Sequence, residues 1–332
     1  MNNRQTAGCF IAFLYLILLT PKQAVCQRNA DLEGIEIAIY DGGQYSGYGT
    51  PRESSMAALY WMFRWMNATV EIVNSSQIRA GLLNNFQMVV VPGGWAYDFY
   101  QDLGSNGLEA VQSFVSEGGS YWGSCAGAFL ACEKIVWIEN RRALPYSYGL
   151  ALFPGVGVGP IAEIADWPNY VMTDIEINQT NGLVNVTSLP HTHSIMYYGG
   201  PYFDLDGTEN VTVVAHYGQN REAAMIAFQY GKGRVFLSGA HPEWDEDSGR
   251  DGCTWENSLE DQESDWELCK AVSHWLVAIE LQAPSPFGGY LIWAVILAGF
   301  IGLLSAIVLM KRRTHKSLSG TERKFMLIYS SN

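Results

Sequence analysis

Short apolar segments alternate with helical patterns in the first half of the chain. The apolar segments cover residues 34–40, 68–73, 86–91 and 119–123, and the helical patterns cover 53–66, 108–115 and 126–132. Buried strands without a regular polar face are typical of a parallel sheet that is covered on both sides. The alternation of strands and helices therefore predicts an α/β fold with a mostly parallel sheet.

The second half has a different pattern, because strand-like segments follow one another with few helical patterns between them. These segments cover residues 170–177, 211–217, 223–230 and 234–238. Gly231-Lys232-Gly233 gives a hairpin signal between the last two. A helical pattern over 264–280 closes the domain. We therefore expect an extra β-rich segment in addition to the parallel sheet.

The N-terminus has the pattern of a secretory signal peptide. Residues 1–26 combine the basic Arg4 with an apolar run and with the small residues Ala24 and Cys26 before the expected cleavage point. These are the three parts that a signal peptide requires. We therefore expect residues 1–26 to be removed.

The C-terminal part has the pattern of a membrane anchor. Residues 287–310 carry no charged side chain, and 24 helical residues at about 1.5 Å each are long enough to cross a bilayer. Basic residues follow directly in the tail 311–332, which places that tail in the cytosol. The prediction is a single-pass type I membrane protein with a folded domain over 27–282 and a stalk over 283–286. We expect it in the plasma membrane, or alternatively in a lysosome or vacuole.

The chain is acidic, with 33 Asp and Glu against 20 Lys and Arg and a formal net charge of −13. This balance argues against a nucleic-acid-binding surface. Five Asn-X-Ser/Thr sequons agree with a domain outside the cytosol and predict a glycoprotein. They are Asn67, Asn74, Asn178, Asn185 and Asn210.

Four cysteines remain after the expected cleavage. Cys253 and Cys269 flank an acidic, serine-rich segment, and in an oxidising compartment they are the natural disulfide pair. Cys125 and Cys132 lie seven positions apart on an expected helix, about 10 Å along its axis, which is too far for a bridge. Cys132 fits a small buried side chain, whereas Cys125 needs another explanation.

That explanation comes from residues 118–128, which read GGSYWGSCAGA at the junction of an expected strand and helix. The spacing Gly-X-Cys-X-Gly is typical of a nucleophile elbow, whose small residues allow a sharp turn that exposes the thiol. The helix N-terminus favours a thiolate, and the N–H of Ala126 can face an oxyanion. Gly94, at the end of the third strand, offers a second N–H. The alternative is a glycine-rich turn with an incidental cysteine.

A candidate base follows the last expected strand. A thiol nucleophile needs a base, and the base needs a carboxylate that orients it. His241 and Glu243 supply both from one turn. The acidic residues that follow, from 245 to 251, raise the cost of a thiolate unless water screens them.

A metal site is a weaker alternative. His191 and His193 can share one strand face, with His216 as a third ligand. A polar loop pair explains the first two more simply, so no metal and no cofactor is expected.

At this point the sequence resembles a known family. The segments VVVPGG, GGSYWGSCAGAF, MYYGGPYF and GRVFLSGAHPEW are similar to those of the biotin-protein ligase N-terminal domain family, within the class I glutamine amidotransferase-like superfamily. The resemblance implies a flavodoxin-like, doubly wound sheet. It also implies Cys125 as nucleophile, His241 as base, Glu243 as its orienter, and Gly94 and Ala126 as oxyanion donors. No segment resembles the biotin-transferring catalytic domain, so biotinylation is not expected.

Two classes of function follow from these observations. The first is a thiol hydrolase that cleaves amide or γ-glutamyl-type bonds of a small molecule or peptide through an acyl-enzyme on Cys125. The second is a binding or interaction domain that retains the elbow for structural reasons. The reactivity of the Cys125 thiol separates them, because an elbow thiolate alkylates near neutral pH and a buried structural thiol does not.

Overall fold

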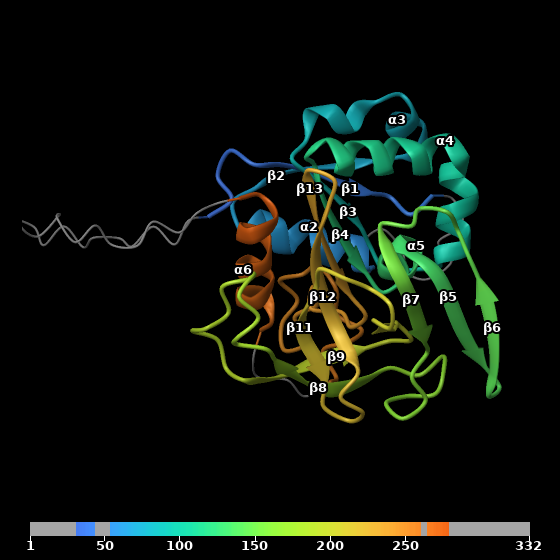
Figure 1. Cartoon of the computed structure of the whole chain (residues 1–332). Coiled ribbons are helices and arrows are strands. Elements are labelled where there is room, and N and C mark those ends of the chain that lie inside the picture. Colours follow the sequence, from blue (N-terminus) through green and yellow to red (C-terminus); the bar gives the residue numbers. More distant parts are fainter. Residues whose placement is uncertain (1–30, 44–53, 260–263, 279–332) are drawn as a thin grey trace, which may run out of the picture. The chain divides into compact units, whose positions relative to one another are not determined.

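Thirteen strands form one mixed sheet in the part of the chain that the computed structural model describes, residues 31–43, 54–259 and 264–278 (Figure 1). Five of these strands lie parallel to one another at one end of the sheet. In spatial order they are β2 (Thr69–Val73), β1 (Glu36–Tyr40), β3 (Met88–Val91), β4 (Ser120–Ser124) and β13 (Gly233–Ser238).

The remaining eight strands continue the sheet beyond β13. The main path runs through β12 (Ala223–Tyr230), β10 (Tyr202–Asp204), β7 (Phe153–Gly159), β5 (Cys132–Glu139) and β6 (Arg142–Tyr146). A branch leaves β12 through β11 (Val211–Tyr217), β8 (Val171–Ile177) and β9 (Thr192–Tyr197).

The expectation of a mostly parallel, doubly wound sheet is therefore wrong. Among the described strands, five pairings are parallel and seven are antiparallel. The main cause is a set of strands that the pattern did not reveal. Strand β7 reads FPGVGVG, and glycine and proline are poor strand formers, so its sequence carries no strand signal. Its glycines lie against other groups, since a Cβ on Gly157 would lie 2.8 Å from Cys132 Sγ.

The described helices cover the two faces of the sheet. They are α2 (Ser55–Trp65), α3 (Ser75–Arg79), η1 (Leu82–Asn85, a 3₁₀ turn), α4 (Ala96–Glu117), α5 (Ala126–Ala131) and α6 (Trp266–Leu276). Helices α3, α4 and α5 contribute to one hydrophobic core, and α2 and α6 to the other. Alternate residues of each central strand point to opposite cores: Ile37 and Ile39 pack with α2, while Ala38 and Tyr40 pack with α4.

None of the helices in the described part of the chain has the length and apolarity needed to cross a membrane. This finding goes against the expected single-pass type I topology and against the plasma-membrane, lysosomal or vacuolar location that was expected with it. The expected signal peptide 1–26, stalk 283–286, membrane span 287–310 and tail 311–332 lie outside the described residues.

The expected disulfide is also absent. Cys253 and Cys269 are both buried and do not form a bridge in the structure. Their sulfurs contact different backbone carbonyls, because Cys253 Sγ lies 3.9 Å from Ser54 O and Cys269 Sγ lies 3.4 Å from Pro242 O. The thiols therefore serve as small buried groups that pack against the loop after β13 and the start of α2.

The five sequons differ in how accessible their asparagines are. Asn67, Asn74, Asn185 and Asn210 are exposed, whereas Asn178 is half-buried and its Nδ2 donates to Val213 O at 3.0 Å. A glycan on Asn178 would remove one of the two hydrogens of that amide nitrogen. Glycosylation of these residues stays a prediction.

Candidate active site

The ends of three neighbouring strands bring the candidate site together. Strands β3, β4 and β13 are adjacent and parallel, with Val91 opposite Gly123 and Ser124 opposite Ser238. Parallel strands present their carboxyl ends at one edge of the sheet, where ligands bind in open α/β sheets. The loops that follow these ends carry Gly94, Cys125 and His241, so the expected residues share one edge.

Cys125 occupies a sharp turn between β4 and α5. Its backbone has φ 48° and ψ −101°, a region that side-chain-bearing residues rarely adopt. Hydrogen bonds fix this turn, since the Cys125 N–H donates to Ser238 O at 2.8 Å and the Gly127 N–H donates to Pro92 O at 3.1 Å. A Cβ on Gly127 would lie 2.1 Å from Val91 O. Glycine at 127 is therefore required for α5 to approach β3.

His241 and Glu243 lie in the turn after β13, as a buried pair. Nδ1 of His241 is 2.9 Å from Glu243 Oε1, and both side chains are almost completely excluded from solvent. The thiol of Cys125 is near enough to the imidazole to act on its pKa. The backbone of the turn is held by β9, because the His241 N–H donates to Met196 O at 2.9 Å. The structure thus brings Cys125, His241 and Glu243 together in one interacting series.

Opposing influences set the pKa of His241. Burial lowers this pKa, because the imidazolium loses hydration. The negative charges and hydrogen bonds of Glu243 and Cys125 raise it, and they prevail, so that the pKa rises from 6.5 to about 10. His241 is therefore an imidazolium at neutral pH, and it can stabilise a thiolate on Cys125.

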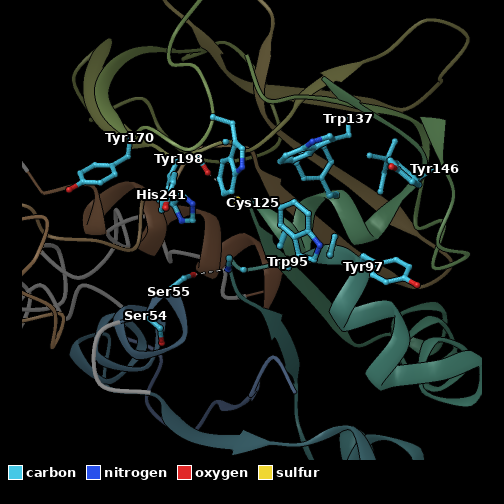
Figure 2. A pocket seen from close by; sticks show the side chains of 18 of the residues that line it. Ser54, Ser55, Trp95, Tyr97, Cys125, Trp137, Tyr146, Tyr170, Tyr198 and His241 are labelled. Atoms are coloured by element: carbon cyan, nitrogen blue, oxygen red, sulfur yellow. Dashed lines mark hydrogen bonds between the residues drawn. The ribbon is translucent and has the colours of Figure 1, made fainter. Parts of the chain in front are cut away.

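Ser55 links the carboxylate to the loop that carries Gly94, a connection that sequence reasoning missed. Its hydroxyl donates to Glu243 Oε1 at 2.5 Å and accepts from the Gly93 N–H at 2.8 Å (dashed line in Figure 2). A Cβ on Gly93 would lie 2.5 Å from His241 Cε1, so glycine is required there too. Ser55 therefore fixes the distance between the acid, the base and the expected oxyanion loop.

Trp244 is a second residue that the sequence did not single out. Its ring stacks on the imidazole of His241 with centroids 4.4 Å apart and planes 13° apart. An aromatic face beside a cation is stabilising, so this stack favours the charged imidazole and fixes its plane.

The expected oxyanion donors have suitable positions in the chain. The N–H of Ala126, the first residue of α5, has no acceptor within its own helix. Gly94 has φ 151°, and a Cβ there would lie 2.8 Å from the ring of Phe99. Both residues line the same cavity as Cys125. Their role as donors stays a prediction.

A cavity of about 750 Å³ opens over Cys125 and His241. This volume is within the usual range for small-molecule sites. Aromatic side chains dominate its lining, and Figure 2 shows several of them around Cys125. They are Trp95, Tyr97, Phe129, Trp137, Tyr146, Tyr148, Trp167, Tyr170, Tyr198, Trp244 and Trp255.

The acidic run after Glu243 is not a water-screened loop. Asp245, Glu246 and Asp251 are buried, although Asp247 is exposed. Arg250 binds Asp245 through two hydrogen bonds of 2.7 Å, and Asp251 accepts from the Cys253 N–H at 2.8 Å. Protein groups rather than water therefore compensate these charges.

The structure separates the three histidines considered as metal ligands. His193 Nδ1 lies 3.1 Å from Asp265 Oδ1, and His216 Nδ1 lies 2.9 Å from Arg221 O. In the described residues, a different group could hold a metal ion: Asp251, Cys253 and Glu256 bring potential ligand atoms within 4.8 Å of one another. Acidic groups that lie close together do not by themselves establish a metal site.

The fold and the site together define a mixed α/β protein with a cysteine, a histidine and a glutamate at the carboxyl edge of its parallel strands. Residues 43–283 match the family described as "Biotin-protein ligase, N terminal". The chain therefore belongs to the biotin-protein ligase N-terminal family, as the sequence resemblance predicted.

Two curated relatives match about half of the chain. An uncharacterized protein of Chlamydia muridarum is 30% identical over 166 residues, which are 48% of this chain and 61% of that protein. A biotin–protein ligase of Schizosaccharomyces pombe is 27% identical over 171 residues, 47% of this chain and 25% of the ligase. The matches thus span less than two thirds of either relative.

Among solved structures, a ThuA-like protein from Bacteroides uniformis has a TM-score of 0.47 and 12% identity. The similarity covers 76% of this chain and 94% of that one. This structural similarity does not indicate a function.

Proposed function

We propose that this chain is a thiol hydrolase that cleaves an amide bond through an acyl-enzyme on Cys125. The observation that supports this most is the interacting series from the thiol of Cys125 through His241 to the buried Glu243, which lies 2.9 Å from His241. A raised pKa on a buried histidine beside a thiol is characteristic of nucleophile activation. The aromatic cavity over the sulfur supplies room for a substrate.

The reaction proceeds in two steps. The thiolate attacks the amide carbonyl carbon and forms a C–S bond, and the N–H groups of Gly94 and Ala126 stabilise the oxyanion. The His241 imidazolium gives its proton to the leaving nitrogen, the C–N bond breaks, and an amine departs. His241, now neutral, takes a proton from water, which attacks the thioester. The C–S bond breaks, releasing a carboxylic acid and restoring the ion pair.

The direct test is to trap the acyl-enzyme. We expect p-nitrophenyl acetate to release nitrophenolate in a burst equivalent to the protein present, and intact-mass and peptide analysis to find the acetyl group on Cys125. Cys125→Ala should abolish the burst. Cys132→Ala is the matched control, because Cys132 is fully buried, its sulfur lies 3.2 Å from Ala128 O, and burial raises the pKa of its thiol strongly. Acetylation elsewhere with Cys125 untouched would refute the mechanism.

A binding function without catalysis is the second candidate. The size and aromatic lining of the cavity favour it as much as they favour a hydrolase. The two functions differ in both steps, because only a hydrolase acylates Cys125 and then turns over p-nitroanilides of the acyl groups that it accepts. Binding of amides without acylation of Cys125 would support the binding function.

A further inference from the structure

The aromatic residues of the cavity contact one another in an unbroken series that begins at the base. The ring of Trp244 stacks on His241, and Trp255 lies 5.0 Å from Trp244. Tyr198 continues the series, 6.4 Å from Trp255 and 5.3 Å from Trp167. The sulfur of Cys125 lies 3.6 Å from the backbone oxygen of Tyr198, so the series passes beside the nucleophile.

Beyond the nucleophile the series widens into three tryptophans, Trp95, Trp137 and Trp167, which we call the tryptophan wall. Their ring centroids lie 5.1 to 5.9 Å from one another. Rings this close leave no room for a ligand between them, so the wall offers its outer faces and not an enclosing cage. Each of the three side chains is only half-buried and lines the cavity.

Trp137 of the tryptophan wall and the base His241 lie on different sides of the nucleophile in Figure 2. In Figure 2, His241 and Tyr170 are on one side of Cys125, and Trp137, Tyr97 and Tyr146 are on the other. During cleavage His241 must reach the leaving nitrogen, which therefore lies on its side of the sulfur. The acyl part of the substrate then extends toward the tryptophan wall.

The charges of the residues that line the cavity also restrict which acyl groups can bind. Among the described lining residues, the ionisable groups other than the cysteine and the tyrosines are His241 and Glu139, and none is Lys or Arg. Glu139 and the negative faces of the aromatic rings disfavour a carboxylate on the substrate. Past the wall, Tyr97 and Tyr146 remain 48% and 43% exposed.

We propose, on the basis of the function proposed above, that the acyl group of the substrate carries a planar ring without a carboxylate, and that this ring stacks on the tryptophan wall. This specificity differs from that of an enzyme for free glutamine or for γ-glutamyl groups with a free carboxylate. The cavity of about 750 Å³ accommodates a ring-bearing acyl group together with its leaving group.

The first test measures binding without chemistry, in the whole 332-residue chain carrying Cys125→Ala. Four primary amides of similar length are titrated by ligand-observed NMR: hydrocinnamamide with a ring, hexanamide without one, glutaramate with a carboxylate, and δ-aminovaleramide with a cation. We expect hydrocinnamamide to bind about threefold to tenfold more tightly than each of the others. Tightest binding of glutaramate, of δ-aminovaleramide or of hexanamide would overturn the proposal, and so would equal binding of all four.

Variants of the wall locate the effect. Trp137→Ala should remove the preference for hydrocinnamamide over hexanamide, and Trp137→Phe should retain most of it. Trp61→Ala is the matched control, because Trp61 is 49% exposed and is not among the residues that line the cavity. A preference that persists in Trp137→Ala would place the ring elsewhere and would refute stacking on the wall.

A second test separates this proposal from the proposed function. Acylation of wild-type Cys125 is followed with p-nitrophenyl esters of hydrocinnamic, hexanoic and glutaric acids, so that the leaving group is constant. Preferred acylation by the hydrocinnamoyl ester supports both proposals. Acylation without that preference refutes the acyl specificity alone. Binding of hydrocinnamamide without any acylation refutes the hydrolase and leaves the ring-binding site standing.

Discussion

Glu243 and Cys125 favour the charged form of His241, whereas burial removes the water that would hydrate the imidazolium. Because Glu243 and Cys125 outweigh the effect of burial, the pKa of His241 rises from 6.5 to about 10. A raised histidine pKa means that the folded state retains a proton which the unfolded state loses first. The stabilising contribution is therefore complete below pH 6.5 and is lost as the pH rises through about 10.

This pKa predicts different pH profiles for two reactions of Cys125. Amide cleavage needs the imidazolium proton for the leaving nitrogen, so acylation by a p-nitroanilide should decline as the pH rises through about 10. Alkylation by iodoacetamide needs no such proton, so it should not decline there. The two rates are measured on the same preparation, and a parallel decline would indicate loss of the fold instead.

Replacing Ser55, which is not one of the three reacting residues, should change both the stability of the protein and the reactivity of Cys125. Ser55→Ala leaves the Gly93 N–H without its hydroxyl acceptor and removes one of the two partners of Glu243 Oε1, in a buried setting. We expect the variant to be destabilised by about 1–3 kcal/mol in chemical denaturation. We also expect alkylation of Cys125 near neutral pH to slow severalfold, since Glu243 loses the hydroxyl that helps to hold it beside the imidazole.

Ser75→Ala is the matched control for that experiment. Ser75 is buried and is the first residue of α3, as Ser55 is of α2, but it lies outside the cavity lining. Its replacement should leave alkylation unchanged. Equal slowing in both variants would mean that Ser55 has no special positioning role.

At the scale of residues, a candidate residue could be predicted from the sequence where its neighbours along the chain form the motif. Cys125 could be identified from its small neighbours, and His241 and Glu243 from their shared turn. Ser55 could not, because the residue that it binds is 188 positions away and its own surroundings carry no motif. The role of Trp244 depends on a ring stacking geometry that composition does not indicate.

At the scale of elements, the junction of β4 and α5 packs closely against β3 and also carries the thiol of Cys125. Gly127→Ala would place a Cβ 2.1 Å from Val91 O, so α5 would have to move away from β3. We expect a loss of about 1–3 kcal/mol of stability and a marked loss of Cys125 alkylation, because the thiol moves away from His241.

Gly249→Ala is the matched control, because it adds the same methyl group at a glycine where there is room for it. Its Cβ would lie 3.4 Å from Cys253 O, which is an ordinary contact. Alkylation of Cys125 and the midpoint of urea unfolding should both stay close to the wild-type values. A Gly127→Ala protein that alkylates normally would show that the elbow tolerates a side chain there.

The elements could be predicted where they are continuous and apolar. The expected strands 34–40, 86–91 and 119–123 correspond to β1, β3 and β4 with ends shifted by up to two residues. Strands β5 to β7, β9 and β10 were missed. Glycines remove the strand signal from β7, and β5 follows α5 with no turn residue between them. The number of antiparallel strands was therefore underestimated.

At the scale of the whole molecule, the buried acidic residues predict how stability depends on pH. Burial raises the pKa of Asp251, and the charge of Asp245 adds to this effect, while hydrogen bonds from the Cys253 and Asp245 N–H groups and with Glu256 oppose it. A raised carboxyl pKa means that the folded state holds the proton more tightly. Its stabilising contribution is present below the ordinary carboxyl pKa of about 4 and is lost as the pH rises through the folded value.

Asp251→Asn removes this titration. We expect the free energy of unfolding of the wild type, relative to the variant, to fall in urea denaturation as the pH rises above about 4. Asp247→Asn changes an exposed carboxyl in the same segment and should leave the pH dependence unaltered. A wild type that gains stability relative to Asp251→Asn as the pH rises would contradict the direction of the pKa shift.

The central claim is that Cys125 and His241 form a working ion pair, and the alkylation of Cys125 by iodoacetamide as a function of pH tests it most directly. The account predicts fast labelling of the wild type below pH 7. It also predicts that in His241→Ala labelling rises only where an ordinary thiol ionises, near pH 8.5. Slow labelling of the wild type with the same profile in both proteins would contradict the account.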